Sequence, residues 1–335
     1  MTRIGINPAR GKTTDAKPQR ITVALVTYLP DLSGYFEHRL EVLKLVIDSL
    51  SAHTSLPHDV MVFDNASCLP VIDYLQQCRQ AGQINFLLLS DRNIGKIDAL
   101  RVLFEAAPGE FIAYADDDIL FYPGWLEAHL RLLESFPQAG MVSGVAVRSA
   151  AGHAHASLDR LAAAPPAGVS ARRERRIPDA WERDWALSTG RDAQAHLDQT
   201  REQLDLVLTA DTPGGAVEAI AGANHFQFVA RKAQILPALP AGWTGRLMGS
   251  MIELDEAVDR LGLLRLSTAG RFTRHLGNAL SPELVREAQA LGLAARAAPT
   301  GPRPAGPRRR PLILRIPGSR RVLVALYNKL FKILF

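Results

Sequence analysis

The feature that most constrains the fold of this chain is an alternation of short apolar runs with helical patterns in its first third. The apolar runs lie at Ile21–Tyr28, Val60–Phe63, Ile84–Leu89 and Phe111–Ala115. The helical patterns between them lie at Leu40–Ala52, Val71–Gln80 and Lys96–Ala107. Strands and helices that alternate in this way predict a parallel sheet covered by helices, and such sheets bind ligands at the carboxyl ends of their strands.

Polar residues stand where these strand-like runs end. Thr27 and Tyr28 end the first run, and Asp64-Asn65-Ala66-Ser67 follows the second. Arg92-Asn93-Ile94-Gly95-Lys96 opens the helical pattern after the third, and a glycine between Asn and Lys at a helix start can receive a phosphate or a sugar hydroxyl. Taken alone, Asp64-Asn65-Ala66-Ser67 is better explained by an Asx turn and helix cap than by a binding role.

Three consecutive carboxylates, Asp116-Asp117-Asp118, follow the fourth run and carry the strongest chemical signal. Like charges at the exit of a buried strand are costly unless a cation or a ligand with many donors compensates them. Mg²⁺ and Mn²⁺ bind through one or two carboxylates together with substrate phosphates. The alternative is a solvated helix start, where capping and the helix dipole favour Asp. The segment favours a metal–phosphate site over this alternative.

In this order and spacing, these segments and the following Pro123-Gly124-Trp125-Leu126 resemble family 2 glycosyltransferases of the GT-A fold. The resemblance covers residues 21–145 and, less completely, 216–280. It implies an α/β fold of GT-A type, with a Rossmann-like, mostly parallel sheet flanked by helices. It also implies inverting transfer of a sugar from a nucleotide-diphosphate-sugar donor of the UDP type, supported by a divalent cation, Mn²⁺ or Mg²⁺.

The resemblance implies donor-binding roles for the polar clusters. The expected donor-binding residues are Thr27, Tyr28, Asp64, Asn65, Asn93, Gly95, Lys96, Asp116 and Asp117. Within this set, Thr27 and Tyr28 would line the base and ribose, and Asp64 would hydrogen-bond the base. Asp116 and Asp118 match the outer acids of the family's DxD motif, with Asp118 as the direct metal ligand. His275 resembles the late histidine of the family that binds the metal or the diphosphate.

The second half of such enzymes normally supplies the base that deprotonates the acceptor hydroxyl. By resemblance Asp255 is that base, within a helical pattern expected over Gly249–Leu263. Because the sequence here is Glu-Leu-Asp-Glu, the base can be Glu253, Asp255 or Glu256. The alternative is that these acids form a solvated helix face and have no catalytic role. Asn224, His225 and Trp243 are candidates for an acceptor platform or for core packing.

Charge is distributed unevenly along the chain, whose 335 residues carry a net charge of +5. Residues 303–335 hold nine Arg or Lys and no acidic residue, whereas residues 21–302 hold 25 basic and 33 acidic residues, a net charge of −8. Residues 319–335 have the pattern of a basic amphipathic helix, which predicts contact with an anionic membrane surface. A helix packed on the domain or at an oligomer interface is the alternative. The acidic body argues against a nucleic-acid partner.

These patterns divide the chain into six expected parts. They are a flexible leader (1–20), a nucleotide-sugar-binding half (21–148), an insertion (149–215), an acceptor-binding half (216–285), a basic linker (286–318) and the C-terminal amphipathic helix (319–335). Within the insertion, the Ala-, Arg- and Pro-rich residues 150–176 predict an exposed excursion. Cys68 and Cys78 form neither a disulfide framework nor a zinc pattern, which favours a reducing compartment. We therefore expect a cytoplasmic protein at the inner face of the cell membrane.

The expected function is transfer of the donor sugar to a saccharide or lipid-linked acceptor in bacterial surface glycan synthesis. Two other functions stay open. A sugar-phosphate nucleotidyltransferase generally carries a glycine-rich, basic loop after its first strand, where this chain has Leu29-Pro30-Asp31-Leu32. A membrane-recruited binding protein with a degenerate site would tolerate loss of Asp118 and Asp255.

Overall fold

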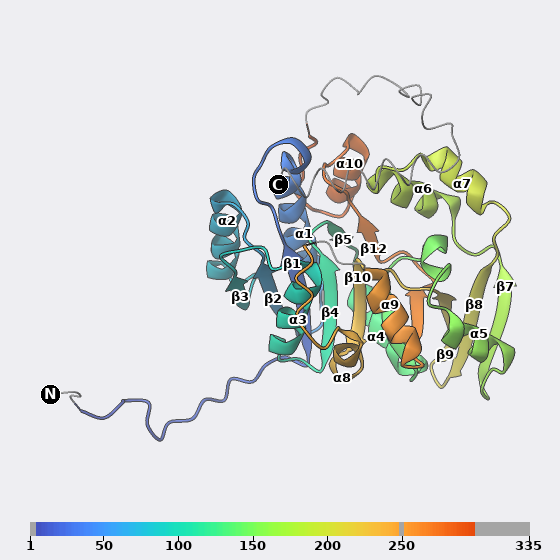
Figure 1. The fold of residues 1–335 in the computed structure, drawn as a ribbon, viewed down its shortest axis with the longest axis horizontal. Helices are drawn as coiled ribbons and strands as arrows, with labels where there is room; N and C mark the ends of the chain where they lie inside the picture. The colour runs from blue at the N-terminus through green and yellow to red at the C-terminus, as the bar shows by residue number, and fades with distance from the viewer. Residues whose placement is uncertain (1–4, 248–250, 299–335) are drawn as a thin grey trace. The chain divides into compact units, whose positions relative to one another are not determined.

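The computed structural model describes residues 5–247 and 251–298 (Figure 1). Its first half alternates strands and helices as the sequence predicts. The elements are β1 (Ile21–Thr27), α1 (Arg39–His53), β2 (Asp59–Asp64), α2 (Leu69–Gln80), β3 (Phe86–Leu89), α3 (Lys96–Ala106) and β4 (Phe111–Asp116). The four strands lie in the order β3-β2-β1-β4, and each neighbouring pair is parallel. The predicted parallel sheet with connecting helices is confirmed over this region.

The second half extends the same sheet to ten strands, in the order β3-β2-β1-β4-β10-β6-β11-β9-β8-β7. The added strands are β6 (Ala139–Ser143), β7 (Val169–Glu174), β8 (Asp205–Thr212), β9 (Gly215–Ala221), β10 (Gln227–Arg231) and β11 (Leu264–Thr268). β10 lies antiparallel between β4 and β6, β11 is parallel to β6, and β9-β8-β7 continue as an antiparallel edge. The fold is therefore an α/β sheet of GT-A type whose parallel core carries an antiparallel extension.

Further helices complete the described residues. They are α4 (Trp125–Ser135), α5 (Ala156–Ala163), α6 (Asp179–Ser188), α7 (Ala193–Thr200), α8 (Lys232–Ile235), α9 (Met251–Arg260) and α10 (Pro282–Ala290), with short 3₁₀ turns at Gly34–Phe36, Arg148–Ala151 and Leu236–Ala238. A small ribbon pairs β5 (Ile119–Phe121) with β12 (Thr273–His275). None of the helices within residues 5–247 and 251–298 is long and apolar enough to cross a membrane.

Residues 150–176 differ from the expected exposed excursion. Within them α5 buries Leu158 and Leu161, and β7 forms the outer edge of the main sheet by pairing with β8. β7 pairs only with β8 among the described strands. Its Ser170, Arg172 and Arg173 are exposed, and its other three residues are half-buried. The amino-acid composition of β7 is typical of a loop, although its backbone pairs with β8. The basic linker expected from residue 286 also begins later, because α10 continues to Ala290. The expected C-terminal helix lies outside the described residues.

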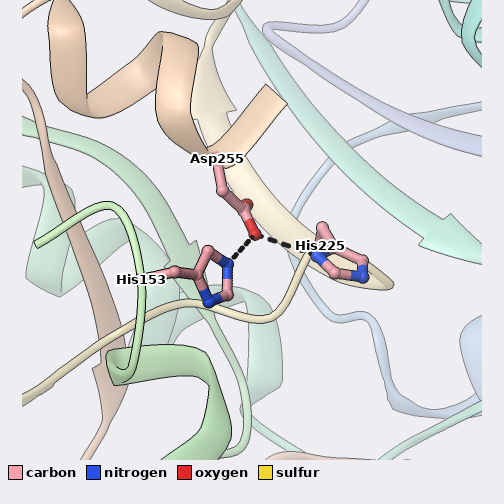
Figure 2. Close-up of side chains that lie close together, drawn as sticks. All are labelled: His153, His225 and Asp255. Atoms are coloured by element: carbon pink, nitrogen blue, oxygen red, sulfur yellow. Dashed lines mark hydrogen bonds and ion pairs between the residues drawn. The ribbon is translucent and has the colours of Figure 1, made fainter. Parts of the chain in front are cut away.

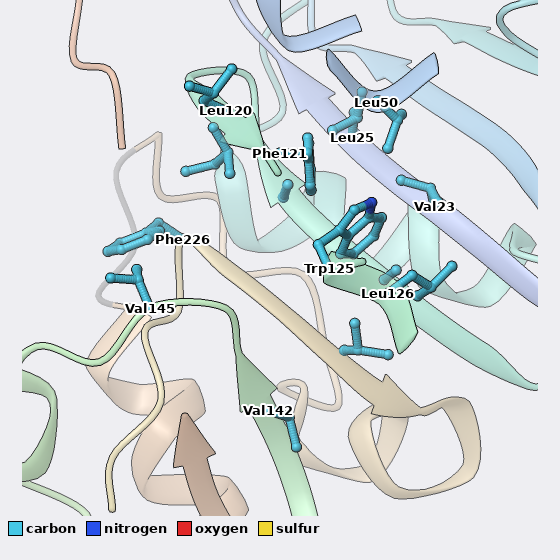
Figure 3. Close-up of a cluster of buried hydrophobic side chains, with 14 of the residues drawn as sticks. Val23, Leu25, Leu50, Leu120, Phe121, Trp125, Leu126, Val142, Val145 and Phe226 are labelled. Atoms are coloured by element: carbon cyan, nitrogen blue, oxygen red, sulfur yellow. The ribbon is translucent and has the colours of Figure 1, made fainter. Parts of the chain in front are cut away.

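The core packs around Trp125, which is fully buried and lies 4.6 Å from the Phe121 ring centroid (Figure 3). Its indole Nε1 donates a hydrogen bond of 3.0 Å to Thr54 Oγ1 at the end of α1. Val23 and Leu25 of β1 belong to the same buried cluster. The Pro-Gly-Trp-Leu segment that contributed to the resemblance therefore supplies a core anchor. This anchor fixes α4 and the β5 ribbon directly after the acidic triplet.

Candidate active site

The register of the parallel strands gathers the predicted polar clusters at one edge of the sheet. Thr27 pairs with Asp64 across β1 and β2, and Val26 pairs with Asp116 across β1 and β4. The β5–β12 ribbon then pairs His275 with Ile119, which places this histidine beside Asp118. The ligand edge that the sequence predicted is thus formed by strand ends from both halves of the chain.

A pocket of about 530 Å³ opens beside this edge. It contains residues predicted for the donor and the acceptor as well as residues that the sequence did not single out. The lining residues are Lys96, Asp116, Ser149, Ala150, His153, Trp185, Thr189, Arg191, Ala223, Asn224, His225, Phe226, Met251, Ile252 and His275. A concave site with convergent polar groups of this size suits a small polar ligand.

Basic side chains of the protein compensate the acidic triplet. Lys96 Nζ lies 2.7 Å from Asp116 Oδ2, and Asp116 also accepts a hydrogen bond from the Tyr114 hydroxyl. Thr27 Oγ1 donates to Asp117 Oδ2 at 2.6 Å. Burial raises the pKa of Asp117 above its usual value. Thr27 therefore contacts the acidic triplet, and its expected role beside the base and ribose stays a prediction.

Arg39, at the start of α1, is the main counter-charge and was not found from the sequence. Its guanidinium pairs with Asp117, donates to Asp118 Oδ2 at 2.7 Å and donates to Gly277 O at 2.9 Å. Burial opposes ionisation of Asp118, but the charges of His275 and Arg39 outweigh it and hold the pKa of this carboxyl below its usual value. No spacing rule links residue 39 to residues 117 and 118, so only the fold reveals this contact.

The residues expected to bind a cation retain unsatisfied ligand atoms. Asp118 Oδ1 is buried and, among the described residues, makes no hydrogen bond. His275 Nε2 lies 3.5 Å from this oxygen. A carboxylate oxygen and an imidazole nitrogen suit Mn²⁺. Asp118 Oδ1 and His275 could therefore bind such a cation together. Asp116 is less available, because Lys96 and Tyr114 already contact its two oxygens.

Asp64 and the loop before α3 form a second part of the donor region. Asp64 is fully buried, and its Oδ2 accepts a hydrogen bond of 3.1 Å from Ser67 N, as in the predicted turn. Its Oδ1 has no partner among the described residues, and burial raises the pKa of this carboxyl. Asn65 Nδ2 donates to Asn93 Oδ1 at 2.9 Å, and Asn65 Oδ1 accepts from Ile94 N. These two asparagines hold the loop against the strand end.

Gly95 is required by the segment that packs over the start of α3. Its φ is +87°, and a Cβ at this position would lie 2.1 Å from the carbonyl oxygen of Arg246. The packed segment is held by Asp98, which accepts hydrogen bonds from the backbone N–H groups of Thr244 and Gly245. Trp243 lies in this segment, is 65% exposed and does not line the pocket. Core packing is therefore excluded for Trp243.

Tyr28, one of the expected donor-binding residues, is 37% exposed.

Asp255 lies at the centre of a hydrogen-bonded cluster (Figure 2) whose two histidines line the same pocket. Its side chain is fully buried, and Oδ2 lies 2.7 Å from His153 Nε2 and 2.9 Å from His225 Nδ1. Arg265 Nη2 lies 3.0 Å from the same oxygen. Figure 2 shows the two imidazoles on either side of the carboxylate, with His225 reaching it through the near ring nitrogen.

Glu253 and Glu256, the other two candidates for the catalytic base, point away from the pocket. Glu253 forms an exposed ion pair of 2.6 Å with Arg246, and Glu256 lies 3.6 Å from Arg260 on the exposed side of α9. Neither lines the pocket that contains Asp116 and His275. Of the three, Asp255 alone connects to that pocket, and it does so through the histidines.

His153, Trp185 and Arg191 are pocket residues that the sequence analysis missed. His153 and His225 meet because Gly222 (φ +95°) leaves room for the backbone of Ala151 to pass, and a Cβ on Gly222 would lie 2.8 Å from Ala151 N. The guanidinium of Arg191 stacks 4.3 Å above the Trp185 ring. All three missed residues stand in the segment expected to be an insertion, so no motif in the sequence marked them.

A GT-A type sheet with an acidic triplet at its ligand edge is typical of glycosyltransferases, and this chain is similar to that class of protein. Residues 35–187 match the family model of glycosyl transferase family 2. This segment therefore belongs to that family, as the motifs predicted, and it includes residues 150–187 that the motifs had left out. No curated protein matches the chain in sequence.

Solved structures of glycosyltransferases are similar to the chain at low identity. S. aureus TarS in complex with UDP-GlcNAc is 17% identical, with 37% of this chain and 34% of that chain covered and a TM-score of 0.31. The mannosyltransferase PcManGT from Pyrobaculum calidifontis, in complex with GDP-Man and Mn²⁺, is 22% identical, with 42% and 41% covered and a TM-score of 0.32. GalNAc-T7 with UDP, GalNAc and Mn²⁺ is 11% identical, with 78% and 44% covered and a TM-score of 0.45. In these three comparisons the chain covers less than half of each solved chain.

Proposed function

We propose that this chain is a metal-dependent, inverting glycosyltransferase that moves a sugar from a nucleotide-diphosphate-sugar to a hydroxyl of a saccharide or lipid-linked acceptor. One observation carries the proposal. A single pocket is lined by Asp116, Lys96 and His275 and by the two histidines of the Asp255 cluster. The first group suits a diphosphate and a cation, and the second suits an acceptor hydroxyl that must lose a proton.

The donor would bind along the carboxyl edge of the parallel strands. Asp64 Oδ1, which has no hydrogen-bond partner among residues 5–247 and 251–298, can accept a hydrogen bond from the imide N–H of a uracil base, and this supports a UDP-type donor. Lys96 stands at the start of α3, where its ammonium group and the backbone N–H groups favour a phosphate. Tyr28, Asn93 and Gly95 border the same path. Arg191, stacked on Trp185, faces the remaining pocket volume and can contact the acceptor.

Asp118 and His275 would hold the divalent cation through Asp118 Oδ1 and the imidazole. When bound, such a cation neutralises the charge that develops on a diphosphate leaving group. Arg39 keeps Asp118 ionised and fixes its other oxygen at 2.7 Å. Asp116 orients Lys96 by the ion pair between them. The Asp255 cluster would remove the acceptor proton on the face opposite the diphosphate.

The basic C-terminal pattern supports a lipid-linked acceptor at the inner face of the membrane, in bacterial surface glycan synthesis. Each basic residue near an anionic surface contributes about 1 kcal/mol of attraction. The full chain should therefore float with anionic liposomes, whereas a chain truncated after Pro307 should stay in the soluble fraction. Equal partitioning of the two would contradict this part of the proposal.

Release of nucleoside diphosphate from UDP-glucose, UDP-GlcNAc and GDP-mannose in the presence of Mn²⁺ tests the proposed reaction. We expect turnover of at least one donor by the wild type and a loss of about 100-fold or more in Asp118→Asn. Asp73→Asn, at an exposed position of α2, is the matched control and should turn over like the wild type. Absence of turnover with every donor, or an active Asp118→Asn variant, would contradict the proposal.

A further inference from the structure

Asp255 is placed too deep to receive a proton from an acceptor itself. Its side chain is fully buried, and it does not line the pocket. Its Oδ2 is already surrounded by His153, His225 and Arg265. A general base must lie within hydrogen-bond reach of the proton that it removes. The carboxylate is therefore suited to orient a neighbouring group.

His225 is the more exposed of the two histidines in the cluster. Both histidines line the pocket, and the side chain of His225 is 35% exposed, compared with 26% for His153. Its Nδ1 lies 2.9 Å from Asp255 Oδ2. Because an ionised carboxylate only accepts hydrogen bonds, we assign the ring proton to Nδ1, which donates a hydrogen bond to that oxygen. In this tautomer Nε2 holds a free electron pair on the opposite side of the ring, which Figure 2 shows turned away from Asp255.

His153 is arranged differently. It reaches Asp255 through Nε2 at 2.7 Å, and Arg265 Nη2 lies 3.4 Å from the same nitrogen. Arg265 also donates to the carbonyl oxygens of His153 and Ala223. Ala223 precedes His225 by two residues, so Arg265 anchors the backbone on both sides of the carboxylate. His153 and Arg265 thus fix Asp255, while the outer nitrogen of His225 stays available.

The position of His225 relative to the donor end is also fixed. The next residue, Phe226, accepts a hydrogen bond of 2.8 Å at its carbonyl oxygen from the backbone N–H of Asp116. The Phe226 ring lies 5.2 Å from the His275 ring centroid in an edge-to-face contact. The histidine is thereby tied to the residues that would hold the diphosphate and the cation.

The same three side chains could in principle hold a second metal ion, because their ligand atoms lie within 4.8 Å of one another. The guanidinium of Arg265 argues against this use. It stands 3.0 Å from the one oxygen of Asp255 that both histidines contact. A divalent cation at that oxygen would meet a fixed positive charge at close range, whereas an imidazole that gains a proton at its far nitrogen would not.

We propose that His225 is the catalytic base of the glycosyl transfer and that Asp255 is its positioning residue; this inference rests on the proposed function. The acceptor oxygen bonds to the anomeric carbon as the bond from that carbon to the diphosphate oxygen breaks, and the bonding pair leaves with the diphosphate. The hydroxyl proton moves to Nε2 of His225. The resulting imidazolium keeps its Nδ1–H on the Asp255 carboxylate, and the proton is later released to solvent through the pocket.

Kinetics of His225→Gln give the first test, with the donors and Mn²⁺ used above. We expect release of nucleoside diphosphate to fall by about 10²- to 10⁴-fold, while UDP or GDP still raises the melting temperature as in the wild type. His155→Gln is the matched control, because His155 forms an exposed pair of 2.5 Å with Asp159 outside this pocket. A His225→Gln variant as active as this control, or one that has lost nucleotide binding, would overturn the assignment.

The histidine tautomer gives a second test that needs no turnover. In ¹⁵N-histidine-labelled protein, the signals absent from His225→Gln identify His225, and we expect the Nδ1–H form with an unprotonated Nε2. Asp255→Asn should change this tautomer and lower turnover with nucleotide binding retained. An Nε2–H form in the wild type, or Zn²⁺ binding that shifts both His153 and His225, would refute the dyad. A wild type that turns over no donor would instead overturn the proposed function.

Discussion

At the scale of single residues, the site depends on charges that the chain itself brings together. The acidic triplet was expected to need a cation or ligand, and the structure places Arg39 and Lys96 against it. Asp118 Oδ1 nevertheless stays buried without a hydrogen bond from any of the described residues. The sequence could predict the triplet because it is contiguous. It could not predict Arg39, because a pair between residue 39 and residue 117 depends on how α1 lies across the sheet.

Arg39→Met tests the strength of this buried pairing. Removal of the cation leaves Asp117 buried without its partner, so we expect the free energy of unfolding in urea to fall by about 3–5 kcal/mol. The double variant Arg39→Met/Asp117→Asn should recover part of the loss, because the unpaired charge is gone. Lys44→Met, which removes an exposed pair with Glu41 on the same helix, should cost less than about 1 kcal/mol. Equal losses in the single and double Arg39 variants would contradict this interpretation.

At the scale of elements, hydrophobic periodicity predicted the parallel half of the sheet but not β7 and β8 at its antiparallel edge. Strands such as β1 are buried on both faces and appear in the sequence as unbroken apolar runs. β7 is paired on one side only, and its arginines face solvent. The same argument explains which site residues the sequence could predict. The motifs at strand ends follow recognisable apolar runs, whereas His153 lies in a segment without a periodic pattern and was not predicted.

Gly95→Ala tests the contact between the start of α3 and the segment that packs over it. The new Cβ would collide with Arg246 O in a backbone conformation that side chains rarely adopt, so we expect a loss of about 2–3 kcal/mol in unfolding free energy. Gly190→Ala has a similar positive φ of +69° but no atom within 4 Å of the Cβ, and it should cost about 1 kcal/mol. Equal effects of the two substitutions would show that the close contact is absent in solution.

At the scale of the whole molecule, one buried histidine couples folding to pH. Burial lowers the pKa of His129 from 6.5 to about 4. Above pH 6.5 both the folded and unfolded forms are neutral at this residue. As the pH falls from 6.5 to 4, the unfolded chain binds a proton that the folded protein excludes, so the free energy of unfolding decreases by about 1.4 kcal/mol per pH unit.

The variant His129→Gln isolates this contribution. We expect its unfolding free energy, measured in urea between pH 7 and pH 4, to decline less steeply than that of the wild type, by about 3 kcal/mol over the range. His155→Gln, at an exposed position, should keep the wild-type slope. Parallel curves for the wild type and His129→Gln would mean that His129 is protonated in the folded protein.

Along the whole chain, the charge is divided between acidic residues 21–302 and basic residues 303–335, and the acidic part contains the proposed nucleotide site. Calorimetric titration of the full chain with UDP and with GDP, each with and without Mn²⁺, measures binding at this site. We expect that at least one nucleotide binds, that Mn²⁺ tightens its binding, and that Asp118→Asn removes the effect of Mn²⁺. Failure of both nucleotides to bind under either condition would contradict a nucleotide-sugar site at the carboxyl edge of this sheet.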